Sequence, residues 1–437
     1  MDTTDVSKAP SRERERSALL LSAMAFFLVL CSYFILRPVR DQLSGAVGSS
    51  ALPMFYAGTF VAMLALTPFF GYLVAHYPRR RLIAICYSFF VVCLLLFVPA
   101  FMSQDRIGAE RLGVVFFTWS SVFNLFVVSL FWSLMADLFS NEQANRLFPL
   151  IGIGGTLGAL VGPILTTALV HVIGVAPLLL VAAVALALAM TILLYLSLRS
   201  GAGADPAEPV GGSILAGIKQ VLTQPFVRLM ALLMLFSDGI GTVAYALLAD
   251  YVKDNVGGAV ARTAFYGRID IATNLLVIIF QLAFTRWMLV RHGAGMSLVL
   301  AEATNVLLFV LLAVFALHSV PLPWFDWHSM TFISVAVPVI ALVVVGSRGL
   351  GYGVIVPASN TLYTRAAREM RYKGKNFVET AVWRFGDVVV TSSVSGLKAI
   401  GAGIPLLALL SAGAATLAGV VGWRAGKSPD LSPAKPK

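Results

Sequence analysis

Long apolar runs dominate this sequence and restrict what it can fold into. Runs long enough to cross a bilayer begin at Ser17, Ala51, Leu82, Leu112, Leu147 and Val175 and, after a break, near Phe226, Thr263, Gly293, Met330, Asn376 and Gly403. A membrane-spanning helix needs about 20 consecutive, mostly apolar residues. With 59% hydrophobic and only 12% charged residues, the chain has too little polar surface for a water-soluble globule. The sequence therefore predicts an all-α polytopic membrane protein of about twelve helices.

The runs form two sets of six. Between them, GAGADPAEPVGGS (201–213) is polar and rich in Gly and Pro, which predicts a linker. The following SILAGIKQVLTQP (213–225) has apolar residues at helical spacing, which predicts a short interfacial helix. The expected domains are an N-terminal tail (1–16), a six-helix bundle (17–200), a linker with this helix (201–225), a second six-helix bundle (226–424) and a tail (425–437). This layout resembles the major facilitator architecture.

The net charge of +11 follows the predicted topology. If the N-terminus is cytoplasmic, the basic run 79–81 and the basic stretch 365–375 lie on the cytoplasmic side. Only a few basic residues, such as Arg106 and Lys253, then lie on the outer side. The positive-inside rule thus places both termini in the cytoplasm and makes nucleic-acid binding unnecessary as an explanation. Residues 1–16 mix acids and bases without a small-residue cleavage site. We therefore expect a multi-pass protein of a bacterial-type plasma (inner) membrane.

Arginines inside the predicted spans point to the chemistry of a ligand. A charge at a helix centre costs roughly 2.5–3.5 kcal/mol on insertion scales, so such residues normally face the bundle interior. A guanidinium is always charged, and its planar fork matches carboxylate or phosphate oxygens. The expected ligand is a small organic anion moved across the bilayer. The predicted substrate-binding residues are Arg37, Arg40, Asp41, Arg268, Arg348, Tyr352 and Arg384.

Acidic residues in the same spans allow a second interpretation. Glu302 lies in the ninth run, and the predicted ion-pairing or proton-coupling residues are Asp238, Asp270, Glu379 and Asp387. Asp387 follows Arg384 by three residues, on one helix face. The sequence leaves open whether these groups pair structurally or contact substrate. It also leaves open a proton-coupled carrier of an unrelated molecule through Asp238 or Asp270, and a non-transporting membrane scaffold or lipid-handling protein.

Several motifs carry no chemistry of their own. In GIGGTLGALVG (152–162), Gly154, Gly158 and Gly162 recur every four residues within an apolar run, which predicts close helix packing rather than a phosphate loop. The five histidines are scattered without ligand spacing, so no metal or other cofactor is expected. Three cysteines lie in apolar runs and do not suggest a disulfide framework. No nucleophile and base are spaced as in an enzyme. The sequence does not indicate an oligomeric state.

Three stretches resemble the ATP/ADP carrier family of nucleotide exchangers. They are YFILRPVRDQL (33–43), VFNLFVVSLFWSLMADLFSNEQANRLFPLIGIGGTLGALVG (122–162) and YTRAAREMRYKGKNFVETAVWRFGD (363–387). The resemblance implies a facilitator-like fold and nucleotide antiport, with Arg37 and the Arg40–Asp41 pair at matching functional positions. Tyr372, Lys373 and Lys375 match the family's Lys-rich loop and, with Arg146, form a predicted cytoplasmic gate loop. In the tenth run, Gly351–Tyr352, Val356–Pro357 and Ser359–Asn360 replace the charged residues of the exchangers, so a nucleotide is only one candidate anion.

Overall fold

A computed structural model describes residues 12–200, 214–316, 318–326 and 331–431. Within these ranges, ten helical segments are long and apolar enough to cross a membrane. One of them, Ala259–Phe315, has 57 residues and is broken by Gly293, whose φ of 77° is not helical. It therefore supplies two passes. The charged eleventh run, which contains Trp383–Ala399, is helical as well but is not among the ten, so the chain has the predicted all-α polytopic fold.

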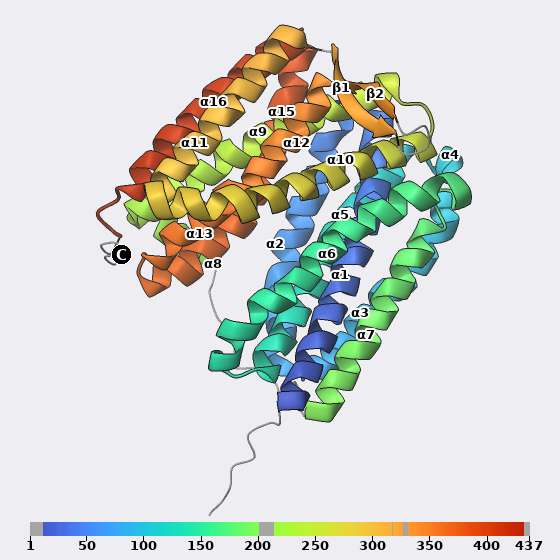
Figure 1. The fold of residues 1–437 in the computed structure, drawn as a ribbon, viewed down its shortest axis with the longest axis vertical. Helices are drawn as coiled ribbons and strands as arrows, with labels where there is room; N and C mark the ends of the chain where they lie inside the picture. Colours follow the sequence, from blue (N-terminus) through green and yellow to red (C-terminus); the bar gives the residue numbers. More distant parts are fainter. Residues whose placement is uncertain (1–11, 201–213, 317, 327–330, 432–437) are drawn as a thin grey trace, which may run out of the picture. The chain divides into compact units, whose positions relative to one another are not determined.

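The first half of the chain supplies six long helices and two short ones (Figure 1). These are α1 (Arg12–Val47), a 3₁₀ turn (Ser49–Ala51), α2 (Leu52–His76), α3 (Arg79–Met102), α4 (Gln104–Ile107), α5 (Ala109–Leu138), α6 (Asn141–Ile173) and α7 (Leu178–Ser200). α1 begins five residues before the predicted Ser17, with Glu13 and Glu15 in its first turn. Acidic side chains there complement the positive end of the helix dipole, so the polar segment extends the helix.

The second half begins with α8 (Ile214–Thr223) in the segment predicted as an interfacial helix. The helices that follow are α9 (Pro225–Asn255), α10 (Ala259–Ile279), α11 (Arg286–Phe315), α12 (Val339–Leu350), α13 (Val356–Thr364), α14 (Lys375–Phe377), α15 (Trp383–Ala399) and α16 (Ile404–Gly426). Single π-helical turns at Phe280–Thr285, Gly351–Ile355, Met370–Gly374 and Val378–Val382 join several of them. The turn at 351–355 contains Gly351 and Gly353.

The predicted start of the tenth run at Met330 is wrong. Thr331–Pro338 forms strand β2, which pairs antiparallel with β1 (Ser319–Asp326), and the helix begins only at Val339. The strand contains Phe, Ile and Val, which favour extended backbone, and the pairs Trp324–Ile333 and Phe325–Phe332 lie opposite one another. Hydropathy alone does not distinguish such a strand from the end of a membrane helix.

The chain divides into two compact units that do not follow its midpoint. Unit 1 comprises Met1–Val39, Leu66–Arg106 and Trp119–Val210, and unit 2 comprises Arg40–Ala65, Ile107–Thr118 and Gly211–Lys437. The ends of α1, α2 and α5 therefore pack within unit 2. Gly45 of α1, for example, lies so close to Val252 and Tyr266 that an added Cβ would be 2.7 and 2.9 Å from their side chains.

The glycine repeat of α6 packs α6 against α1 in unit 1. An added Cβ would lie 2.2 Å from the Ala23 carbonyl oxygen at Gly154, 2.2 Å from the Phe27 carbonyl oxygen at Gly158 and 2.9 Å from the Cys31 carbonyl oxygen at Gly162. Any side chain at these positions would collide with backbone. The prediction of close helix packing is confirmed, and the glycines do not form a phosphate loop.

Candidate functional site

The C-terminal part of α1, which belongs to unit 2, carries an ion pair that is bound by the seventh span. Arg40 Nη2 lies 2.7 Å from Asp41 Oδ1, and Arg40 Nε donates a hydrogen bond of 2.8 Å to the same oxygen. The Tyr245 hydroxyl of α9 donates to that oxygen at 3.0 Å and lies 2.7 Å from the Ser44 hydroxyl. Asp41 is fully buried. Because a buried carboxylate needs compensation, these contacts explain how α1 tolerates the charge.

Arg348 of α12 forms a second pair beside the first. Its Nη1 lies 3.7 Å from Asp270 Oδ1 of α10, and its guanidinium lies over the Tyr245 ring at 5.2 Å from the centroid. The distance of 3.7 Å is an ion-pair contact but is too long for a hydrogen bond. Arg348 Nη1 is buried and has no hydrogen-bond acceptor among the residues that the structure describes.

A third group lies on α15 and α9. Arg384 Nη1 is 3.2 Å from Asp387 Oδ2, as the three-residue spacing predicted, and the guanidinium lies 4.6 Å from the centre of the Trp383 ring. Thr242 of α9 donates a hydrogen bond of 2.9 Å to the other Asp387 oxygen. The Asp238 carboxyl lies beside the Asp387 carboxyl and interacts with it electrostatically. Neighbouring carboxyls repel each other when both are ionised.

Tyr56 of α2 connects these groups within unit 2. Its partly buried side chain lies within electrostatic range of Arg40, Arg348, Asp387 and Tyr245. Three arginine–aspartate pairs, contributed by α1, α10, α12 and α15, therefore surround aromatic side chains of α2 and α9. We call this set the arginine cluster, with Arg40, Arg348 and Arg384 as its cations.

Three other predicted site residues are not members of the arginine cluster. Arg37 belongs to unit 1, where its guanidinium lies 5.6 Å from the Phe34 ring centre. Arg268 is exposed on α10, although Asp270, two residues later, is buried. Tyr352 is 45% exposed on the π-helical turn. Within unit 2, the structure thus brings Arg40, Asp41, Arg348 and Arg384 together, and Arg268 and Tyr352 are exposed.

The residues predicted as a gate loop take part in local ion pairs. Lys373 lies 3.2 Å from Glu369, and Lys375 lies 3.6 Å from Glu379, each pair one helical turn apart. In unit 1, Arg146 at the start of α6 lies 2.5 Å from Glu15 of α1. The Tyr372 side chain is outside the described part of the structure. Glu379, predicted as a coupling residue, is therefore paired with a lysine of this loop rather than with the arginine cluster.

Sequence reasoning missed the uncharged members of the arginine cluster. Thr242 and Tyr245 follow Asp238 on α9 at spacings of four and seven residues, which places all three on one helix face. That polar stripe could have been recognised in the sequence as a polar face of the helix, because apolar residues surround it. Tyr56 had no such signal, since it is an isolated polar residue in an apolar run. Ser44 lies one helical turn after Asp41, so its position on the same face of α1 could have been read from the sequence.

Among the described residues, no group of three or more His, Cys, Asp and Glu side chains could hold a metal ion.

Comparison with known protein families shows which family the chain belongs to. The family model described as Major Facilitator Superfamily matches residues 19–376. The chain belongs to the Major Facilitator Superfamily. It is thus a member of a family of secondary transporters, which work by movement of two related halves around a site near the bilayer midplane.

Solved facilitator structures share this fold at low sequence identity. A bacterial homologue of the iron transporter ferroportin in an inward-facing state matches with a TM-score of 0.66 and 16% identity, over 96% of this chain and 100% of that one. The nucleoside transporter NupG matches with a TM-score of 0.61 and 14% identity over 94% and 99% of the two chains. The POT family transporter PepTSo gives 0.65 and 12% over 94% and 98%. No curated protein matches the sequence.

Proposed function

We propose that this facilitator transports a small organic anion by alternating access and that Arg348 and Arg384 are anion-binding groups. The observation that carries the proposal is the incomplete pairing of Arg348. Its one acidic neighbour lies 3.7 Å away, and the buried Nη1 makes no hydrogen bond within the described structure. A buried guanidinium with an unused donor is costly unless an acceptor arrives, and a substrate carboxylate or phosphate would supply one.

The resident aspartates are compatible with this role. An arginine in a transport pathway must stay charged when no substrate is bound, and a nearby carboxylate lowers that cost. Tyr245 and Trp383 cover the faces of the Arg348 and Arg384 guanidinium groups, at 5.2 and 4.6 Å, which leaves their N–H edges for an oxygen ligand. In the cycle we propose, the substrate anion accepts hydrogen bonds from the N–H edges of the two arginines. Their aspartates remain in ion-pair contact with them.

Within the class of organic anions, a nucleotide is the specific candidate. It is supported by the resemblance of residues 33–43, 122–162 and 363–387 to the ATP/ADP carriers, and exchange of one nucleotide for another is the corresponding activity. Arg37, one helical turn before Arg40 on α1, would then contribute a further positive charge. We place the protein in a bacterial-type inner membrane with both termini in the cytoplasm, on the distribution of its basic residues.

Counter-exchange in proteoliposomes tests the proposal. Vesicles loaded with ADP, phosphate or a dicarboxylate are supplied with the labelled anion, and uptake is compared for the wild type, Arg348→Gln and Arg384→Gln. Loss of a hydrogen bond to a charged group is worth about 1.5–3 kcal/mol, so we expect uptake to fall roughly 10- to 100-fold in either variant. Arg228→Gln, at an exposed arginine of α9, is the matched control and should transport normally. Equal uptake by all four proteins would refute the assigned residues, and no exchange of any anion by folded protein would refute the function.

A proton-coupled mechanism is the second candidate, and the carboxyl pair Asp238–Asp387 favours it. A shared proton between two carboxyls can be loaded on one side of the membrane and released on the other. Asp238→Asn should then abolish uptake driven by a pH gradient and leave exchange at equal pH intact. If Asp238→Asn responds to the gradient as the wild type does, the carboxyl pair has no coupling role.

A further inference from the structure

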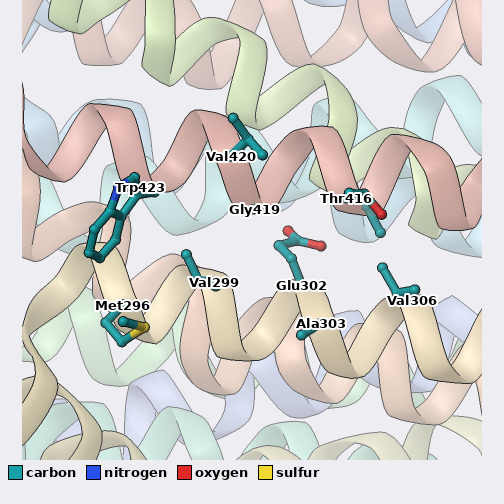
Figure 2. A pocket seen from close by; sticks show the side chains of 10 residues that line it. Met296, Val299, Glu302, Ala303, Val306, Thr416, Gly419, Val420 and Trp423 are labelled. Carbon is teal, nitrogen blue, oxygen red and sulfur yellow. The ribbon is translucent and has the colours of Figure 1, made fainter.

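A groove between α11 and α16 in unit 2 holds a buried carboxylate that the proposed function does not use. The cavity has a volume of about 530 Å³, within the usual range for small-molecule sites. Its walls come from Met296, Val299 and Val306 on α11 and from Val420 and Trp423 on α16. Figure 2 shows the Glu302 carboxylate between the two helices, opposite Gly419. An added Cβ at Gly419 would be in ordinary van der Waals contact with the Glu302 Cβ, at 3.5 Å.

Glu302 has neutral partners only. Asn305 Nδ2 donates a hydrogen bond of 3.0 Å to one carboxylate oxygen, and the Ser237 hydroxyl of α9 donates to the other. In the described part of the chain, no Lys, Arg or His lies within ion-pair distance of Glu302. The residue is only 1% exposed. An ionised carboxylate in such a place requires a positive partner, because burial of an unpaired charge is strongly unfavourable.

The groove opens on an apolar surface that is typical of lipid contact. Neighbouring leucines of both helices are exposed, among them Leu307 at 64% and Leu417 at 52%. One end of the groove is marked by Trp423, with Lys427 Nζ at 3.9 Å from its ring centre. Trp and Lys together are typical of the membrane–water interface. Glu302 lies six residues beyond Met296 on α11, about 9 Å deeper by helical rise.

This depth determines which cation can reach Glu302. A hydrated inorganic ion would have to shed its water and find several oxygen ligands, but the groove offers one carboxylate among apolar walls. A cation whose charge is shielded by apolar substituents dissolves in the bilayer and matches both parts of the groove. We propose that this groove is a binding site for lipophilic organic cations that enter from the bilayer, with Glu302 as the counter-charge. The proposal stands independently of anion transport.

Equilibrium binding of radiolabelled tetraphenylphosphonium to the full-length protein in lipid nanodiscs tests the site. The wild type should bind it saturably, and Glu302→Gln should weaken binding at least tenfold, because the amide keeps the shape but lacks the charge. Glu142→Gln, at an exposed carboxyl of α6, is the control and should bind as the wild type does. Ala303→Trp narrows the groove from its exposed side and should also reduce binding. Weaker binding in both variants could not be explained by misfolding of Glu302→Gln alone.

A second measurement uses unaltered protein. Dicyclohexylcarbodiimide is an apolar reagent that modifies protonated carboxyls reached from the bilayer, so it is applied at acidic pH, and mass spectrometry locates the adduct. We expect modification of Glu302 and protection of Glu302 by tetraphenylphosphonium. Equal binding by the wild type and Glu302→Gln would overturn the proposal. It would also be overturned by an unmodified Glu302, which means that lipid does not reach the groove, or by modification without protection, which means that the groove takes only a proton.

Discussion

The hydroxyl of Tyr245 joins the seventh span to the end of α1, and removing it tests whether the arginine cluster stabilises unit 2. Tyr245→Phe keeps the ring, which is 2% exposed and lies under Arg348, and deletes only the oxygen. Two contacts are lost, the hydrogen bond of 3.0 Å to Asp41 and the 2.7 Å contact with Ser44. Asp41 is then held by Arg40 alone within the described structure.

The expected magnitude follows from the nature of the two contacts. Hydrogen bonds between membrane helices average about 0.6 kcal/mol in double-mutant cycles, which suits the contact with Ser44. A bond to a charged acceptor is worth more, about 1.5 kcal/mol at the lower limit, which suits Asp41. We therefore expect the free energy of unfolding to fall by about 2 kcal/mol, roughly a 30-fold change in the unfolding equilibrium constant.

Equilibrium unfolding in mixed micelles, followed by tryptophan fluorescence, measures this change. Tyr251→Phe is the matched control, since Tyr251 lies on the same helix and its hydroxyl makes no hydrogen bond among the described residues. It should change the free energy of unfolding by less than about 0.5 kcal/mol, because the substitution keeps the partly buried ring and removes no hydrogen bond. A loss in Tyr245→Phe no larger than that in Tyr251→Phe would refute the view that this hydroxyl supports Asp41.

Two further predictions concern helix packing and a partly exposed ion pair. Gly158→Ala should destabilise unit 1 by about 1–3 kcal/mol in the same unfolding assay, because its Cβ would lie 2.2 Å from a backbone oxygen of α1. Gly152→Ala, which would meet nothing within 4 Å, should be neutral or slightly stabilising, and equal effects of the two would contradict the close approach. Lys398 of α15 pairs with Asp250 of α9, and side-chain exposures of 30% and 25% limit the strength of the pair. A double-mutant cycle of Lys398→Met and Asp250→Asn should give a coupling energy of about 1 kcal/mol, and additive effects would show that the pair is not stabilising.

The spans and the glycine packing of α6 could be predicted from the sequence because their causes are local. A bilayer requires every spanning helix to be apolar over about 20 residues, so each span is visible within its own segment. Gly154, Gly158 and Gly162 recur at helical spacing and could be interpreted without knowing the partner helix. The pair Arg384–Asp387 was predictable for the same reason, since both residues lie on one face of one helix.

The partners of the remaining charges could not be predicted in this way. Asp41 and Tyr245 are 204 residues apart, and Arg348 meets Asp270 of a different helix. Such contacts depend on which helices are neighbours and on how each is rotated about its axis. Hydropathy reports neither, because lipid and protein interior are about equally apolar. The exposed position of Arg268 and the distance of Glu302 from every described basic side chain have the same origin.

The sequence by itself thus determined that the chain crosses a membrane many times, where most of its helices lie and which helical turns carry charge. Only the tertiary structure decided that residues 331–338 form a strand, that three arginines each face an aspartate around Tyr245 and Trp383, and that Glu302 lies in an apolar groove with no described basic side chain in ion-pair contact. The physical reason is that the bilayer acts on each segment separately, whereas ion pairing acts only between side chains that packing has brought together.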